Sequence, residues 1–190
     1  MVYIRGNKRD FDLWRQLGCT GWSFDDVLPF FKKMECHQSR TDKFHGTDGP
    51  VAVKRSETQN ELFDAFIEAG KTAGYPQTDD FNGDNQEGFG RYDFTIKNGR
   101  RQSSAVGYLK KSRKRKNLEI RTQAYANKII INNCHAEGVR YTKLGFEKTV
   151  FARQEIILSL GTFNSPALLQ VSGIGSKKDL NDLGVPIVSE

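Results

Sequence analysis

Residues 155–175 read EIILSLGTFNSPALLQVSGIG. The apolar run at residues 156–158 predicts a short buried strand. Ser165 and Pro166 suit the N-cap and first turn of an apolar helix, and Gly173 is a typical helix stop. A strand that enters a helix through a glycine turn leaves free backbone N–H groups at a positive helix end, which can bind phosphates. The corner alone does not establish such a site, because many α/β domains contain similar corners that bind nothing.

Further motifs follow one another along the chain. In order, they are MVYIRGNKRDFDLW at 1–14, GWSFDDVLPFF at 21–31, GPVAV at 49–53, GFG at 88–90, NGRRQSSA at 98–105 and NLEIRTQA at 117–124. With residues 161–175, they resemble the signatures of the glucose–methanol–choline (GMC) oxidoreductases, which are FAD-dependent alcohol-oxidising enzymes. The segment 1–14 is more similar to the choline and aliphatic-alcohol dehydrogenase branch than to the fungal sugar oxidases.

The resemblance implies a fold class. We expect an α/β fold of mixed helices and strands, forming a portion of a Rossmann-like FAD/NAD(P)-binding domain with part of an inserted substrate-binding domain. Residues 1–50 and 99–190 would belong to the FAD-binding domain, and residues 51–98 to the first part of the substrate-binding domain. The alternation of short helices and strands read from the sequence agrees with this class.

The resemblance also implies four cofactor-binding positions. The backbone of Met1 and Val2 corresponds to the part of the family motif that passes the isoalloxazine ring of the flavin. Ala126 lies in a segment whose backbone approaches the adenine, although the family usually has valine there. Gly161 would approach the ADP part of FAD, where a side chain would block close contact.

Two parts of the family's chemistry have no counterpart in the sequence. The dinucleotide fingerprint G-x-G-x-x-G is absent, and so is the C-terminal histidine that acts as the base in the family. We therefore assign no catalytic residue and interpret His37, His45 and His135 as surface or loop histidines. We expect an interior fragment of a flavoenzyme, or the product of a truncated gene, that lacks dehydrogenase activity and retains FAD weakly as an isolated polypeptide.

The expected chemistry is that of an alcohol oxidoreductase. The CH–OH group of choline or an aliphatic alcohol would be oxidised by hydride transfer to the flavin. The sequence leaves open the identity of this small-molecule substrate, the choice between dehydrogenase and oxidase, the electron acceptor and the oligomeric state. Two alternatives stay open: a catalytically inactive remnant with a structural role, and a basic module that binds a polyanion such as RNA or anionic lipid.

The charge of the chain is concentrated in one run. The 190 residues carry a net charge of +6 at pH 7 and a sequence pI of about 9.2. The run KKSRKRK at 110–116 contains no aromatic residue to stack on bases, so we expect a solvated loop and no nucleic-acid partner. No apolar run approaches the ~20 residues of a membrane-spanning helix.

The three cysteines, Cys19, Cys36 and Cys134, are far apart in the sequence. Their odd number favours a reducing compartment such as the cytoplasm over a disulfide framework, and peripheral membrane association stays open. The Cys and His spacings match no zinc motif. The aspartates at residues 79–84 match no calcium loop, so we expect no metal and a solvated loop.

Local patterns predict the remaining elements. We expect helices at 24–31 after the N-cap Ser23, at 61–73, at 105–109 and at 177–183. We expect strands at 51–53, 92–96, 118–122, 128–131, 138–141, 149–152 and 185–188. Turns are predicted at 98–99, 132–133 and 144–145. Residues 35–49 and 78–90 are predicted to be loops.

Overall fold

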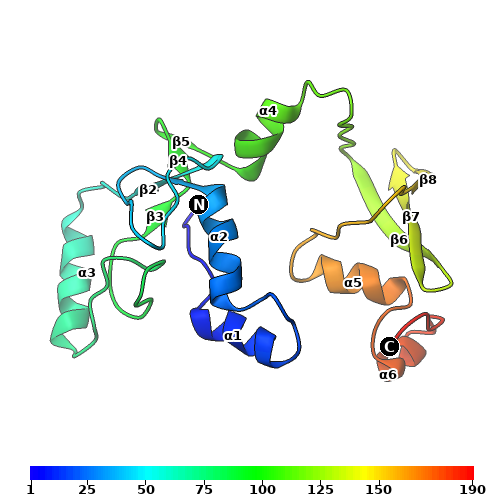
Figure 1. Cartoon of the computed structure of the whole chain (residues 1–190), viewed down its shortest axis with the longest axis horizontal. Coiled ribbons are helices and arrows are strands. Elements are labelled where there is room, and N and C mark those ends of the chain that lie inside the picture. The colour runs from blue at the N-terminus through cyan, green and yellow to red at the C-terminus, as the bar shows by residue number, and fades with distance from the viewer. The chain divides into compact units, whose positions relative to one another are not determined.

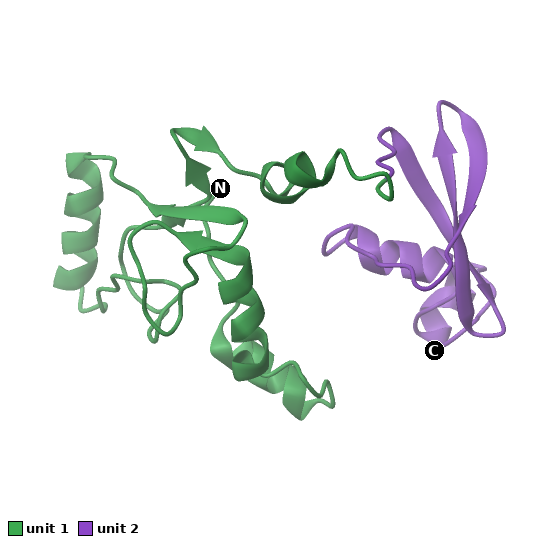
Figure 2. Cartoon of the chain, turned by 45° about the horizontal axis from the view of Figure 1, so that its top comes forward, with its two compact units in different colours: residues 1–118 green, residues 119–190 purple.

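The computed structural model describes all 190 residues, which form two compact units, Met1–Leu118 and Glu119–Glu190 (Figure 2). Unit 1 is the first of these and unit 2 the second. Each unit combines helices with short strands (Figure 1), which confirms the expected mixed α/β character. The chain contains no helix of the length and apolarity needed to cross a membrane.

Unit 1 contains five helical elements, of which the first three begin at a side-chain N-cap and the last two have none. They are α1 (Lys8–Gln16), α2 (Phe24–Met34), α3 (Glu61–Thr72), the π-helical turn η1 (Ala105–Leu109) and α4 (Lys110–Ser112). At the start of α2, the Ser23 hydroxyl accepts a hydrogen bond from the Asp26 N–H, and the Asp26 carboxylate accepts one from the Ser23 N–H. This reciprocal capping box confirms the predicted N-cap.

The sheet of unit 1 is built around β2 (Val51–Arg55), whose first three residues are buried. It pairs in parallel with β1 (Glu35–His37) and antiparallel with β3 (Asp93–Phe94). A separate hairpin of β4 (Ile96–Lys97) and β5 (Arg100–Arg101) closes at the predicted turn, where φ is 50° at Asn98 and 70° at Gly99. Positive φ at both turn residues matches the twist of the flanking strands.

An apolar cluster joins the two N-terminal helices. Its buried members are Phe11, Phe24 and Val27, and Leu28, Phe31 and Phe44 pack partly buried against them. The rings of Phe11 and Phe31 meet edge to face at 5.8 Å. Phe44 comes from the segment between β1 and β2, so the cluster also holds that segment against the helices.

Unit 2 is an antiparallel meander with two helices. The strands β6 (Ala124–Asn132), β7 (His135–Lys143) and β8 (Phe146–Phe151) pair in that order, followed by α5 (Asn164–Val171) and α6 (Lys177–Asp182). Ser172, directly after α5, ties the helix to the sheet. Its Oγ accepts a hydrogen bond from the Ile129 N–H at 2.8 Å and donates to the Leu168 carbonyl at 2.6 Å.

Three predicted strands do not form. Residues 156–158 belong to no ladder, and the Ile157 side chain is 76% exposed. Residues 118–122 precede the first strand of unit 2, and residues 185–188 are followed only by an isolated bridge between Ile174 and Ser189. An apolar run becomes a strand only when a neighbouring strand satisfies its backbone groups, and these runs have no such neighbour in the chain.

Other local predictions also need correction. Ser165 is not the N-cap of α5: Phe163 occupies that position, and the Ser165 hydroxyl accepts a hydrogen bond from the Leu160 N–H at 3.1 Å. The predicted loop at 35–49 begins with β1, whose Glu35 is held by buried partners described below. The basic run at 110–116 begins with α4, because lysine is a good helix former and the segment continues η1.

Candidate functional site

The corner before α5 carries a row of free backbone donors. Gly161 has a φ of 91°, and a Cβ placed there would meet no atom within 4 Å. The N–H groups of residues 161–164 make no hydrogen bond within the chain, whereas the next N–H, of Ser165, donates to the Gly161 carbonyl at 3.1 Å. Free N–H groups at a helix N-terminus attract anions. The corner therefore fits the ADP part of FAD that the sequence predicts at Gly161.

A second predicted position lies in β6. Ala126 pairs with Tyr141, and the register of the ladder shifts between Ala126 and Lys128. At the shift, Asn127 donates from Nδ2 to the Thr142 hydroxyl at 2.8 Å, while its buried Oδ1 has no hydrogen-bond partner. A buried acceptor without a donor is destabilising.

The N-terminal segment carries the other two predicted positions. The Met1 carbonyl accepts a hydrogen bond from the Thr95 N–H at 2.9 Å, and Val2 forms an antiparallel bridge with Phe94. The side chains of Met1 and Val2 are about half exposed. The structure thus places these two residues on one extended segment of unit 1, while Ala126 and Gly161 lie in unit 2.

A row of buried charges links four segments of unit 1. Arg5 Nη2 lies 2.5 Å from Glu35 Oε2, and His45 Nδ1 lies 3.0 Å from Glu35 Oε1. His45 Nε2 lies 2.8 Å from Asp80 Oδ2. Because both ring nitrogens of His45 face carboxylate oxygens, both carry hydrogen and the ring is an imidazolium. We call these four residues the Arg5–Asp80 network.

The charges of this network stabilise one another. Burial disfavours the imidazolium, but hydrogen bonds to Asp80 and Glu35 outweigh it and raise the pKa of His45 to about 9. Burial likewise disfavours the Asp80 carboxylate, yet its hydrogen bond with His45 lowers the pKa of Asp80 to about 2. His45 and Asp80 are therefore both charged at neutral pH.

His37 is buried next to the network. Its Nδ1 accepts hydrogen bonds from the backbone N–H groups of Ser39 at 3.2 Å and Arg40 at 3.1 Å. The proton of a neutral ring is therefore on Nε2, which lies 3.4 Å from Asp93 Oδ2. The rings of His37 and His45 meet edge to face at 4.8 Å.

Two predictions about this region are wrong. His37 and His45 are not surface histidines, because both side chains are fully buried; His37 lies in β1, and only His45 lies in a loop, between β1 and β2. Asp80 is not freely solvated: its side chain is 15% exposed and bonds to His45, which lies 35 positions away in the sequence. Such distant partners leave no local pattern. His135, at the start of β7, is exposed as predicted.

The same side chains form two groups that are close enough to share a metal ion: Glu35 with His37 and His45, and Asp42 with His45 and Asp80. Arg5 already occupies one oxygen of Glu35, and His45 uses both nitrogens as hydrogen-bond donors. The hydrogen-bonding capacity of His45 is thus filled by protons and carboxylates. We assign no metal to either group.

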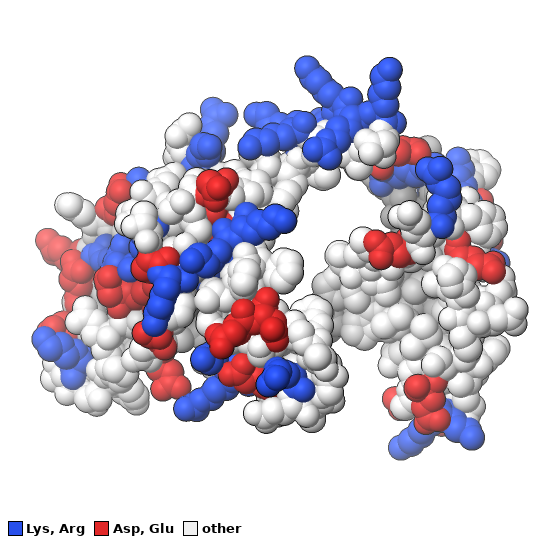
Figure 3. Space-filling model, viewed as in Figure 1, with Lys and Arg blue, Asp and Glu red and all other residues white.

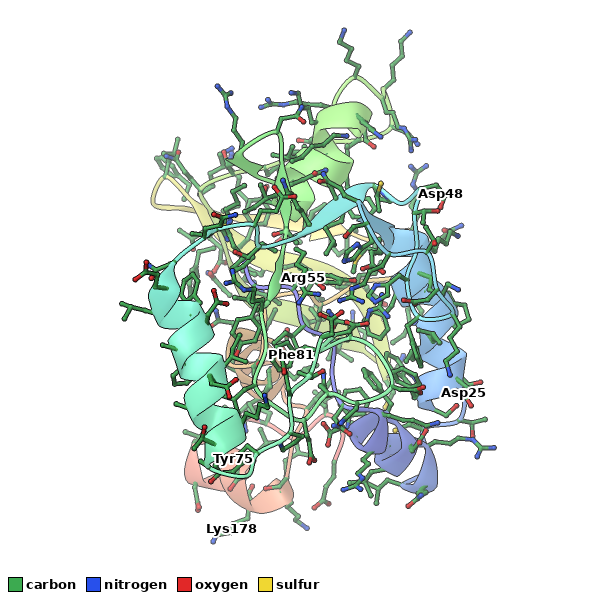
Figure 4. The ribbon with its side chains drawn as sticks, turned by 90° about the vertical axis from the view of Figure 1, so that its left-hand side faces the viewer. Asp25, Asp48, Arg55, Tyr75, Phe81 and Lys178 are labelled. Atoms are coloured by element: carbon green, nitrogen blue, oxygen red, sulfur yellow. The ribbon has the colours of Figure 1, made fainter.

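A cleft of about 570 Å³ opens in unit 1 between the start of α1 and the loop at residues 81–87. Figure 4 shows the loop that carries Phe81 between α3 on one side and α1 and α2 on the other. The Phe81 ring stacks on Tyr92 at 4.8 Å. None of the four predicted cofactor-binding residues lines this cleft, so we do not assign it to FAD.

The family model for GMC oxidoreductase matches residues 1–189. The chain belongs to the GMC oxidoreductase family. Over 187 residues it is 49% identical to an oxygen-dependent choline dehydrogenase of Sinorhizobium fredii, covering 98% of the chain and 34% of that relative. Pyridoxine 4-oxidase from Mesorbium loti has a TM-score of 0.88 at 33% identity, over 100% of the chain and 38% of that structure. An FAD-dependent oxidoreductase from Chaetomium thermophilum has a TM-score of 0.89 at 28% identity, over 100% and 35% respectively.

These similarities confirm the GMC family and FAD as its cofactor, both expected from the sequence motifs. The chain spans about a third of the length of the curated relatives that it matches, 34% in the choline dehydrogenases. The cofactor contacts of individual residues in this GMC chain stay predictions. Sequence reasoning missed the Arg5–Asp80 network and the free acceptor of Asn127, because neither produces a motif or a periodic pattern.

Proposed function

We propose that this chain forms part of the FAD-binding framework of an enzyme that oxidises the CH–OH group of choline or an aliphatic alcohol. The observation that carries the proposal is the 49% identity to an oxygen-dependent choline dehydrogenase across 98% of the chain. When bound, FAD supplies the hydride acceptor. The contribution of the chain is to bind and orient it.

Each predicted position has a role in this proposal. The free N–H groups at residues 161–164 would bind the ADP part of the cofactor, next to the open face of Gly161. The backbone at Ala126 would approach the adenine, close in sequence to the free Oδ1 of Asn127. The exposed segment of Met1 and Val2 would run along the isoalloxazine ring.

The chain supplies no base for the alcohol proton in this proposal. His45 is an imidazolium with two carboxylate partners and has no free nitrogen to accept a proton. The Nδ1 of His37 already accepts two backbone hydrogen bonds. His135 is exposed at the edge of a hairpin. We therefore propose that the polypeptide by itself binds FAD weakly and does not turn over alcohols.

A binding and turnover experiment tests both parts. The 190-residue polypeptide is titrated with FAD, and the quenching of flavin fluorescence is measured with and without ADP. We expect weak binding that ADP competes away, because the ADP part would occupy the corner before α5. Turnover of choline or a primary alcohol is then measured with an artificial electron acceptor. Steady turnover would contradict the proposed lack of a base. An absence of FAD binding at saturating concentration would contradict the cofactor role.

The basic run supports a second candidate function, the binding of a polyanion. Its six cationic side chains at residues 110–116 are exposed and form no ion pair within the chain. Figure 3 shows lysine and arginine side chains gathered over α4 and the segment that follows it. Retention on a heparin column that falls with salt, and that disappears when Lys114, Arg115 and Lys116 are changed to Gln, would support this candidate.

A further inference from the structure

Asn82 takes the place of a strand partner beside the N-terminal segment. Its Oδ1 accepts a hydrogen bond from the backbone N–H of Arg5 at 2.8 Å, and its Nδ2 donates to the carbonyl of Tyr3 at 3.0 Å. Asn82 is 4% exposed, so both bonds are buried. The N–H of Asn82 donates to Asp80 Oδ1 at 2.8 Å, which fixes Asn82 within its loop and connects it to the Arg5–Asp80 network.

The side chain of Asn82 continues a ladder that β3 begins. The Thr95 N–H donates to the Met1 carbonyl at 2.9 Å, and the Tyr3 N–H donates to the Asp93 carbonyl at 2.8 Å. In an extended chain, the C=O of one residue and the N–H two residues later point to the same edge. The next such pair, on Tyr3 and Arg5, meets the amide of Asn82, which offers a donor and an acceptor side by side as a peptide group does.

Arg5 makes further hydrogen bonds with both its backbone and its side chain. Its carbonyl accepts a hydrogen bond from Gln86 Nε2 at 2.8 Å. Its Nη1 donates to the Phe44 carbonyl at 2.7 Å, and its Nη2 pairs with Glu35. Both the backbone and the guanidinium of Arg5 are therefore held. The backbone of Tyr3 and Arg5 is therefore held in one position where it contacts Asn82.

We propose that Asn82 is a positioning residue for the flavin. It sets the course of residues 1–5 and thereby the position of the Met1 and Val2 backbone against the isoalloxazine ring. This inference rests on the proposed function, from which the flavin-facing role of Met1 and Val2 comes. In this role Asn82 does not touch the flavin, and it acts only through the backbone of Tyr3 and Arg5.

Two substitutions at Asn82 and one control substitution test the inference in the full-length gene product. Asn82→Ala removes both hydrogen bonds. Asn82→Asp keeps the shape and the acceptor for the Arg5 N–H, but it turns a carboxylate oxygen toward the Tyr3 carbonyl. Asn85→Asp is the matched control. It introduces the same charge at an exposed position of the same loop and keeps the acceptor for the Glu87 N–H.

Three measurements are made on each variant: hydrogen exchange of the Arg5 amide without FAD, the Kd for FAD, and the visible circular dichroism of the bound flavin. In Asn82→Ala we expect exchange about tenfold faster and FAD binding about tenfold weaker, as the loss of buried hydrogen bonds implies. In Asn82→Asp, which places a buried carboxylate against the Tyr3 carbonyl, we expect a lower melting temperature, weaker FAD binding and an altered spectrum of the flavin that still binds. Asn85→Asp should match the unsubstituted protein in all three.

The outcomes separate this inference from the proposed function. If FAD leaves the exchange of the Val2 amide unchanged in the unsubstituted protein, the proposed flavin contact of this segment is wrong. If FAD protects Val2 but both Asn82 variants bind FAD as Asn85→Asp does, with the same flavin spectrum, the positioning role is wrong. If Asn82→Ala does not fold, Asn82→Asp decides the question by the same measurements.

Discussion

The imidazole of His45 and the carboxylate of Asp80 meet at 2.8 Å between Nε2 and Oδ2, joining two loops that lie 35 positions apart in the sequence. On its other side the same ring bonds to Glu35, which in turn pairs with Arg5. The loop at residues 78–90 is thus held to the sheet and to the N-terminal segment by alternating charges. We therefore expect the hold on this loop to weaken when His45 loses its proton or Asp80 gains one.

The stability of unit 1 should therefore depend on pH. The pKa of His45 is raised from 6.5 to about 9, so its contribution is complete below pH 6.5 and is lost as the pH rises through about 9. The pKa of Asp80 is lowered from 3.8 to about 2, so its contribution is present above pH 3.8 and is lost as the pH falls through about 2. We expect these two groups to stabilise the unit most between about pH 4 and 6.5.

Urea unfolding followed by tryptophan fluorescence measures this dependence, because the two tryptophans of the chain, Trp14 and Trp22, both lie in unit 1. His45→Gln should remove most of the decrease in stability between pH 6.5 and 9. His135→Gln, at an exposed position of unit 2, is the control and should leave the decrease intact. The same slope in both variants would show that His45 is not the titrating group.

Glu35→Gln should strongly destabilise unit 1. The substitution leaves Arg5, which is 2% exposed, without its counter-charge, and His45 loses one of its two carboxylate partners. Breaking a buried ion pair in this way costs about 3–5 kcal/mol of unfolding free energy. Glu68→Gln is the control, because Glu68 pairs with Lys71 at the surface, and such a pair contributes about 0–1 kcal/mol. Equal urea midpoints for the two variants would refute the importance of the buried pair.

Gly161→Ala should weaken FAD binding beyond its effect on folding. An L-residue at a φ of 91° is strained, which costs about 1–2 kcal/mol. The new methyl group would also stand at the open face where the ADP part is proposed to bind. Gly184→Ala is the control, because Gly184 also has a positive φ, 65°, and open space around it. Fluorescence titration with FAD should show a loss of affinity for Gly161→Ala alone. Equal losses would argue against a cofactor contact at Gly161.

Ser172→Ala should loosen α5 from the sheet. The buried hydroxyl bridges the Ile129 N–H and the Leu168 carbonyl, and its removal leaves the N–H without a partner. An unsatisfied buried donor costs about 1–3 kcal/mol. Hydrogen exchange at Ile129 should accelerate accordingly. Ser189→Ala, with an exposed side chain that makes no hydrogen bond, should leave this exchange rate unchanged. An unaltered rate in Ser172→Ala would mean that other contacts hold the helix.

Elements specified by neighbouring residues could be predicted from the sequence. Ser23 and Asp26 lie within one turn of each other, so the start of α2 follows from local chemistry. The turn at Asn98 and Gly99 needs only two residues that tolerate positive φ. The turn predicted at 132–133 lies one residue later, at Asn133 and Cys134. Cys134 has a φ of 59° there, and cysteine is not a residue type that predicts a positive φ.

Features that depend on distant partners could not be predicted in this way. Residues 156–158 have the composition of a strand, but strand formation requires a neighbour that local composition does not specify. For the candidate site, the glycine corner at Gly161 is visible as a motif. The bond between Asn82 and Arg5 spans 77 positions and involves an ordinary loop asparagine. Nothing in the residue types distinguishes Asn82 from Asn85, and only the folded chain shows which of the two is buried.

The meander of unit 2 has two edges of different character. At the β6 edge, the Ile129 N–H is already bonded to Ser172. At the opposite edge, all six residues of β8 are exposed, and no strand of the chain lies beside its outer side. Unpaired backbone groups of this kind are a template for strand addition, and the charges of Glu147 and Lys148 oppose a purely apolar guest. A further strand could therefore pair along β8 without displacing an existing hydrogen bond, whereas pairing along β6 would compete with the bond between Ile129 and Ser172.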